Sequence, residues 1–200
     1  VDFMIDDDGL ALRYQEQPTF GIAESFTLRR VNCLSFTMMF IAMARASGIH
    51  AFAQASEDAL AMRMQGGTLY RATHVNAGVQ INGERHSVDV GWRGVAAGRK
   101  PRRISDARTV ALLHNNHAVE HLLQGEHAAA AGSIDAALAL DGSSATIWSN
   151  AGVVHARAGR RDDAGRAYVR AVTLQRDHIG ALSNLVGFHQ ANGNTAQVAA

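Results

Sequence analysis

Residues 111–200 repeat themselves every 34 positions, and this periodicity restricts the possible fold more than any other feature of the sequence. Three blocks align when they begin at Ala111, Ala145 and Ile179. Matching positions carry the same residue type, namely His121, His155 and His189, then Gly125, Gly159 and Gly193, then Ala130 with Ala164 and Ala137 with Ala171. A period of this length indicates a small structural unit that stacks on copies of itself and shares a core with its neighbours.

The period and the small residues resemble the tetratricopeptide repeat (TPR), a helix-turn-helix unit in which two antiparallel helices approach closely. The resemblance is most specific for the middle block, from Trp148 to Arg176. Only the first helix of the third block is complete. Residues 111–200 are therefore expected to form an all-α TPR solenoid of about two and a half repeats.

The single cysteine, Cys33, stands at the start of a second distinctive stretch. Helix formers and large apolar side chains follow it as far as Gly48. This pattern predicts a helix that begins at Cys33, is buried all round and ends at Gly48. The unpaired N–H groups and the dipole at a helix N-terminus favour a thiolate, which attacks carbonyls. Cys33 alone is equally compatible with a small buried apolar residue.

Residues 73–90 predict a β-hairpin that turns at Asn82-Gly83. With a two-residue loop, Val79 faces His86, and this register fixes which side chains share a face. His74 and Asp89 become diagonal neighbours on the polar face, at a separation that an imidazole and a carboxylate can span.

Cys33, His74 and Asp89 follow one another in the chain as a nucleophile, its base and the group that orients the base. Residues 20–90 resemble the transglutaminase-like superfamily of papain-type cysteine enzymes, in which a Cys opens a core helix, a His starts a strand pair and an Asp follows. The run from Asn32 to Thr37 is similar to a bacterial branch in which TPR repeats follow this domain. The resemblance implies an α+β catalytic domain, with a core helix packed on an antiparallel sheet, and a Cys-His-Asp triad. Many relatives have glycine where this chain has Val31-Asn32.

Composition places the chain among ordinary globular proteins, with 47% apolar residues and a formal net charge of +1. With so small a net charge, no nucleic-acid partner is predicted for the chain as a whole. No membrane span is predicted either, since no run of about 18 apolar residues occurs. Basic residues gather between Gly91 and Arg108, and we interpret this stretch as a solvated linker rather than a site for an acidic partner or nucleic acid. The expected domains are a catalytic domain over 1–92, a basic linker over 93–110 and TPR repeats over 111–200.

Two segments of the first domain carry further expectations. Residues 49–54 resemble a strand. Ser56 to Met64 is expected to form a short helix that borders the site as a lid or substrate wall. The chain begins at Val1 in mid-pattern, so a longer precursor is expected, and either bacterial cytoplasm or periplasm is compatible with a single cysteine.

His114, His117 and His121 share one helical face at a spacing suited to metal ligands. They also occupy positions where the repeat normally packs large apolar side chains, and His121 recurs as His155 and His189. Repeat packing is therefore the preferred interpretation, and no metal or cofactor is predicted.

The favoured function is hydrolysis of peptide or protein amides through a thioester on Cys33. An amine in place of water would make the protein a transglutaminase or peptide ligase, and the triad does not separate these outcomes. A non-catalytic TPR scaffold and an acetyl-transfer enzyme are further alternatives, although no cofactor-binding signature accompanies the latter. The repeats are expected to recruit a peptide, protein substrate or protein partner through Asn150, Asn184 and Trp148.

Overall fold

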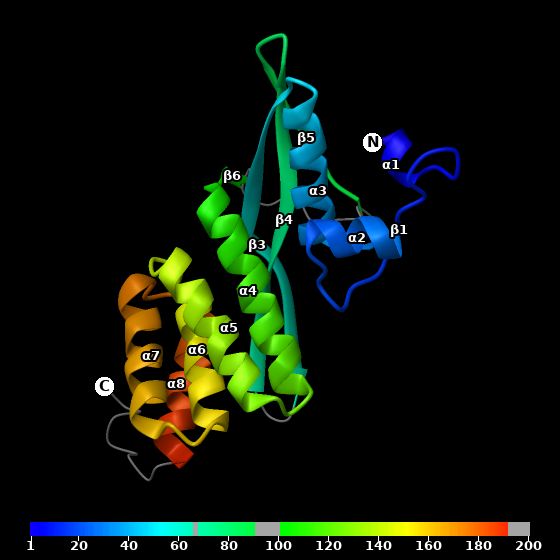
Figure 1. Ribbon diagram of the computed structural model, residues 1–200. Helices are drawn as coiled ribbons and strands as arrows, with labels where there is room; N and C mark the ends of the chain where they lie inside the picture. Colours follow the sequence, from blue (N-terminus) through cyan, green and yellow to red (C-terminus); the bar gives the residue numbers. More distant parts are fainter. Residues whose placement is uncertain (66–67, 91–100, 192–200) are drawn as a thin grey trace. The chain divides into compact units, whose positions relative to one another are not determined.

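The computed structural model describes residues 1–65, 68–90 and 101–191, and the side chains of these ranges apart from 56–73. Helices and strands mix as far as Arg103, and helices alone follow from Asp106 (Figure 1). The chain divides into two compact units, one made of Val1–Ala61 with Thr73–Thr109 and the other of Met62–Ala72 with Val110–Ala200. This mixture of helices and an antiparallel sheet agrees with the predicted α+β class at its coarsest level.

Helix α3 (Cys33–Ala46) begins at the predicted residue. Asn32 caps it, because its side-chain oxygen accepts a hydrogen bond from the backbone N–H of Ser35 at 2.9 Å. Gly48 follows the helix in the left-handed conformation, with φ of 77°, as a glycine beyond the last turn commonly does. The expectation that α3 is buried all round holds for most of the helix, but its end exposes Ala42, Arg45 and Ala46.

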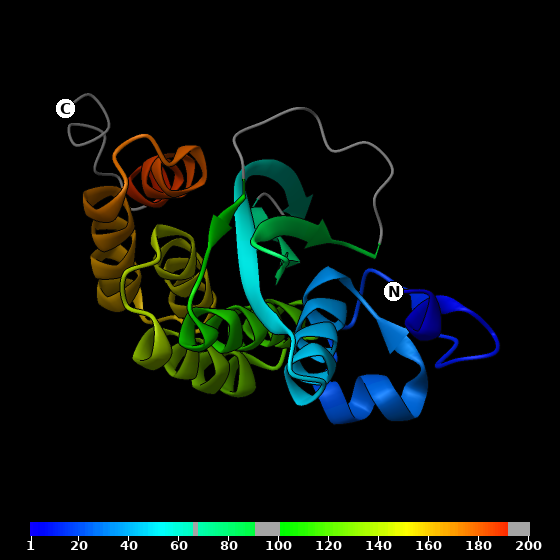
Figure 2. The ribbon, with the colours of Figure 1, turned by 90° about the horizontal axis from the view of Figure 1, so that it is seen from above.

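Residues 1–31 form short elements that pack against α3: α1 (Asp2–Ile5), β1 (Arg13–Tyr14), α2 (Ile22–Leu28) and β2 (Arg30–Val31). The two strands pair in parallel, and α2 lies alongside α3 (Figure 2). An apolar cluster joins the amino-terminal segment to α3 through Met4, Leu10, Leu12, Val31, Phe36 and Met39. This cluster fixes the chain immediately before Cys33.

A four-stranded sheet has the order β5-β4-β3-β6: β3 (His50–Gln65), β4 (Thr68–Ile81), β5 (Glu84–Val88) and β6 (Arg102–Arg103). All of it belongs to the first unit except Met62–Ala72, at the end of β3 and the start of β4. The predicted hairpin is confirmed, since Val79 pairs with His86. Asn82 and Gly83 both have positive φ, 52° and 84°, as a type I′ turn requires. The turn residues therefore determine which side chains of β4 and β5 share a face.

The predicted helix from Ser56 to Met64 is wrong, because these residues belong to strand β3. Leu60, Met62 and Met64 alternate with other residues in the sequence, and a period of two fits a strand as well as the capping signal at Ser56 fits a helix. Pairing along a long hairpin with β4 overrides the local helix signal. The expected lid or substrate wall is thus a strand extension, whose side chains lie outside the described residues.

The expected linker also contains ordered elements. Arg103 of β6 pairs with Gln54 of β3, and α4 starts at Asp106. Asp106 forms a bidentate ion pair with Arg45, at 2.7 and 3.0 Å. Local composition concealed this arrangement because the pairing partners lie about fifty residues earlier in the chain. Residues 93–100 of the expected linker lie outside the described residues.

The helices after the sheet repeat with the predicted period: α4 (Asp106–Leu123), α5 (His127–Leu140), α6 (Ala145–Arg157), α7 (Arg161–Leu174) and α8 (Ile179–Ala191). Helices α4, α6 and α8 end 34 residues apart, and so do α5 and α7. Gly125 and Gly159 occupy equivalent turns, with φ of 79° and 76°. Among the described helices, none is long and apolar enough to cross a membrane.

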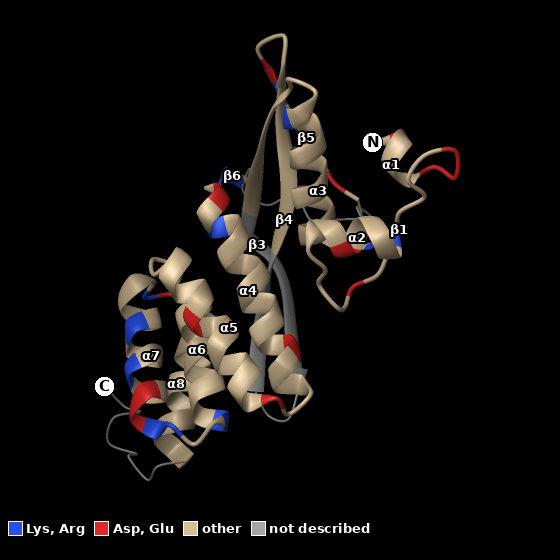
Figure 3. Ribbon diagram, viewed as in Figure 1, with Lys and Arg blue, Asp and Glu red and all other residues tan. Residues whose placement is uncertain are grey.

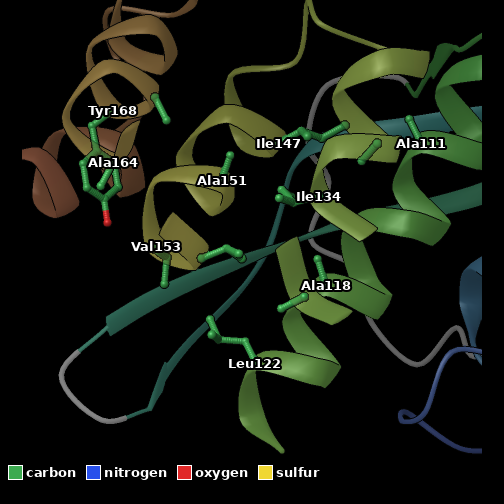
Figure 4. Close-up of a cluster of buried hydrophobic side chains, with 13 residues drawn as sticks. Ala111, Ala118, Leu122, Ile134, Ile147, Ala151, Val153, Ala164 and Tyr168 are labelled. Atoms are coloured by element: carbon green, nitrogen blue, oxygen red, sulfur yellow. The ribbon is translucent and has the colours of Figure 1, made fainter. Parts of the chain in front are cut away.

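Small side chains allow these helices to pack closely, and the buried cluster consists largely of alanine with a few larger residues (Figure 4). Gly152 of α6 marks one such close contact. A Cβ atom added there would lie 2.4 Å from the ring of Tyr168 on α7, so only glycine fits beside this ring. The small residues that recur in the sequence thus serve the contact between neighbouring helices.

Candidate active site

Cys33 is the first residue of α3 and is partly exposed. The first N–H groups of a helix have no acceptor within the helix. Asn32 satisfies the N–H of Ser35, which leaves the N–H groups of Cys33 and Leu34 at the helix end without a helical acceptor. These two amides and the helix dipole provide a positive environment beside the sulfur.

Hydrogen bonds to Thr19 and Phe20 also fix the chain at the start of α3, next to Cys33. Asn32 donates its amide N–H to the hydroxyl of Thr19 at 2.8 Å, and both side chains are buried. The Ser35 hydroxyl donates to the carbonyl oxygen of Phe20 at 2.7 Å. Asn32 has φ of −103° and ψ of −173°, an extended conformation that any residue adopts. A glycine is therefore not required before the cysteine.

His74 links Cys33 to Asp89. Its Nε2 lies 2.5 Å from Oδ2 of Asp89, and its side chain also forms a hydrogen bond with Cys33. Since Nε2 contacts the carboxylate, Nδ1 is the ring nitrogen that remains for the thiol. The sequence register had placed His74 and Asp89 on one sheet face, and the structure brings them together with the cysteine.

The surroundings of His74 favour its charged form. The hydrogen bond to Asp89 comes first and the hydrogen bond to Cys33 second in raising the pKa of His74 from 6.5 to about 10, although burial acts in the opposite direction. The side chain of Asp89 is 9% exposed and that of His74 is 23% exposed. The carboxylate is thus screened from water where it meets the ring, which strengthens its effect on the imidazole.

Asn76 is a site residue to which the sequence analysis assigned no role. It is 5% exposed, and its Nδ2 donates to Oδ2 of Asp89 at 3.4 Å. Oδ1 of Asn76 and Oδ1 of Asp89 are both buried without a hydrogen-bond partner among the described residues. The signal in the sequence is the spacing of two between His74 and Asn76, which puts both side chains on one face of β4.

The residues predicted to recruit a substrate or partner, Asn150, Asn184 and Trp148, each form a hydrogen bond within the helical repeats. Asn150 is 2% exposed and donates to Oδ1 of Asn115 at 2.9 Å. Asn184 makes the equivalent bond, one repeat later, to the hydroxyl of Ser149 at 3.3 Å. Asn150 therefore connects two helices from a buried position. Trp148 donates its indole N–H to the carbonyl oxygen of Gly142 and is partly buried.

The histidines with metal-like spacing do not converge. The rings of His114 and His117 meet edge to face, with centroids 6.4 Å apart, and Nδ1 of His121 lies 2.6 Å from Oε2 of Glu126. In the described part of the chain, no group of three His, Cys, Asp or Glu side chains could hold a metal ion.

The sequence matches no protein-family model and no curated protein. The candidate site therefore rests on its geometry: a partly exposed thiol at a helix N-terminus, an imidazole between this thiol and a buried carboxylate, and backbone amides beside the sulfur.

Proposed function

We propose that the protein is a cysteine-dependent acyl-transfer enzyme that hydrolyses peptide or protein amides through a thioester on Cys33. The observation that carries this proposal is the position of His74, which forms hydrogen bonds with both Cys33 and Asp89. A nucleophile, a base and a group that orients the base are the minimum set for such chemistry.

The proposed reaction has two stages. The Cys33 sulfur, its proton transferred to His74, attacks the amide carbon, and the N–H groups of Cys33 and Leu34 stabilise the oxygen that gains negative charge. The intermediate collapses, the C–N bond breaks and His74 gives its proton to the departing nitrogen, which leaves a thioester on Cys33. Water then attacks the thioester while His74 accepts its proton, and the carboxylic acid and free thiol result.

The charge state of His74 suits the first stage. Asp89 and Cys33 raise the pKa of this residue to about 10, so the ring is an imidazolium at neutral pH when the sulfur is negatively charged. An imidazolium is the acid that an amide needs, because an amine leaves only when its nitrogen is protonated. Asp89 stabilises the ring and fixes its orientation, as the carboxylate of a catalytic triad does.

We further propose that this first unit is a transglutaminase-like domain and that the following helices are TPR repeats that recruit a substrate or protein partner. Helix bounds that recur every 34 residues and the close contact at Gly152 support the second part. The buried position of Asn150 moves the proposed docking role away from that residue.

The proposal is tested with a library of peptides that carry an electrophile, followed by mass spectrometry of the labelled protein. Because Cys33 is the only cysteine, Cys33→Ala provides a complete blank. Rapid labelling of the folded wild type, with a clear preference among peptides, is expected. Labelling that occurs only after denaturation would contradict a catalytic role for Cys33. Adding an amine acceptor to an ester substrate separates hydrolysis from amine transfer, since the amide product forms only in the second case.

A further inference from the structure

Two arginines from the two edge strands of the sheet meet at one aromatic ring. The guanidinium carbon of Arg103, on β6, lies 4.7 Å from the centre of the Phe52 ring, and that of Arg85, on β5, lies 5.4 Å from it. Phe52 is only 3% exposed, whereas both arginines are exposed. One buried ring thus contacts two cations at the surface of the first unit, and their guanidinium carbons, 4.7 and 5.4 Å from the same point, are at most about 10 Å apart. Figure 3 shows the basic residues of β6.

A glycine sets the position of this ring. A Cβ atom at Gly78, on β4, would lie 2.4 Å from the Phe52 ring, so the ring rests directly on the backbone. The neighbouring Gln54 is 1% exposed and donates to the hydroxyl of Ser87 at 2.6 Å. Arg103 stands opposite Gln54 in the ladder. The packed floor beneath the two guanidinium groups therefore spans β3, β4 and β5.

The arginines share a sheet face with His74 and Asp89. Alternate residues of a strand point to the same side, so Gly78 lies on the face of β4 that carries His74. Arg85 is paired with Gln80, which belongs to the same alternate set. With a rise of about 3.3 Å for each residue, Gly78 lies about 13 Å from His74 along β4. An extended peptide covers that distance in about four residues.

No described carboxylate forms an ion pair that balances the charges of these arginines. The charge of Arg103 helps to lower the pKa of Asp106 at longer range, but the hydrogen bonds of the Asp106 carboxylate go to Arg45. Two cations close together repel each other, and an anion between them removes the repulsion. Arginine side chains are well suited to this role because their N–H groups match the two oxygens of a carboxylate.

We infer that Arg85 and Arg103 bind a carboxylate of the peptide substrate about four residues from the bond that Cys33 attacks. This inference rests on the proposed function, because it assigns a substrate preference to that site. The carboxylate belongs either to an Asp or Glu side chain or to the end of a peptide, and both have the same chemistry. The protein is therefore expected to prefer acidic peptides.

The experiment uses peptides with a chloroacetyl electrophile on a central side chain. Matched pairs carry Glu or Gln at the fourth residue before or after the centre, and a third pair ends four residues after the centre in a free carboxylate or a carboxamide. The rate constant for labelling of Cys33 is measured from the intact mass of the full-length protein. The rate constant for iodoacetamide, which has no peptide, is measured in parallel and tests the reactivity of Cys33 by itself.

Wild type is expected to react about tenfold faster with the acidic member of at least one pair, a ratio that corresponds to about 1.4 kcal/mol. This ratio should fall as salt is added. In Arg85→Ala/Arg103→Ala the ratio should approach one. Arg161→Ala/Arg170→Ala removes the same charge from exposed positions of α7 and should keep the wild-type ratio. Arg85→Lys/Arg103→Lys, which keeps the charges over the ring, should retain part of it.

A ratio near one for wild type in all three pairs would overturn the inference, and so would a wild-type ratio in the Arg85→Ala/Arg103→Ala variant. If the alanine variant fails to fold, as judged by circular dichroism, the lysine variant and the salt dependence in wild type decide the question. If iodoacetamide labels Cys33 rapidly but the peptide pairs show no preference for the acidic member, only the carboxylate site is refuted. Failure to label the folded protein with any reagent would instead refute the proposed function.

Discussion

Replacing Asp89 with asparagine tests the arrangement of the candidate site. A rise in the pKa of His74 from 6.5 to about 10 corresponds to roughly 5 kcal/mol in favour of the imidazolium, and the hydrogen bond to Asp89 is its largest cause. Asparagine keeps the size of the side chain but removes its charge. The pKa of His74 is therefore expected to fall by at least about one unit, which is about 1.4 kcal/mol. Amide or ester turnover should fall by about a hundredfold or more.

The assay is an NMR titration of the His74 ring together with the rate of turnover. Glu84→Gln is the matched control, because it removes a carboxylate at an exposed position of β5, the strand that ends just before Asp89. The control should leave the pKa of His74 unchanged. If Asp89→Asn leaves this pKa near 10, the carboxylate is not its cause and the triad assignment is wrong.

Three further outcomes follow from the structure. The raised pKa of His74 stabilises the fold below about pH 6.5, and this contribution is lost as the pH rises toward about 10, so urea unfolding should show a decline over that range that Asp89→Asn reduces. Gly152→Ala should destabilise the repeats by about 1–3 kcal/mol because its Cβ atom meets Tyr168, whereas Gly132→Ala, in open space, should not; equal midpoints in thermal unfolding would contradict this packing. Burial first, and then Arg160, lower the pKa of His155, so Arg160→Glu should raise this pKa in an NMR titration, and an unchanged value would exclude a contribution from Arg160.

The parts of the fold that short sequence signals determine were predictable. Asn82-Gly83 fixes a two-residue turn, and the turn fixes the register that places His74 and Asp89 on one face. The start of α3 was equally clear, because an N-cap residue, Asn32, precedes a long apolar run. The helical repeats were visible as a period, since each unit uses the same small residues at the same contacts.

Features that depend on distant pairing were not predictable from local patterns. The stretch that begins at Ser56 carries both a capping signal and alternating apolar residues, and only its pairing with β4 decides for the strand. β6 lies in a basic stretch and forms because Arg103 meets Gln54. The buried bond between Asn115 and Asn150 likewise depends on how neighbouring repeats stack, which a period alone does not specify.

The most direct test of the proposed chemistry is to look for an acyl group on Cys33 during turnover of a small activated ester. Wild type is expected to show one acyl group for each protein molecule in the intact mass spectrum, and to lose it as product forms. Cys33→Ala should show none, and His74→Ala should neither acquire nor release the group at a comparable rate. Absence of the adduct in wild type, or an adduct that persists without turnover, would contradict an acyl-transfer function for this site.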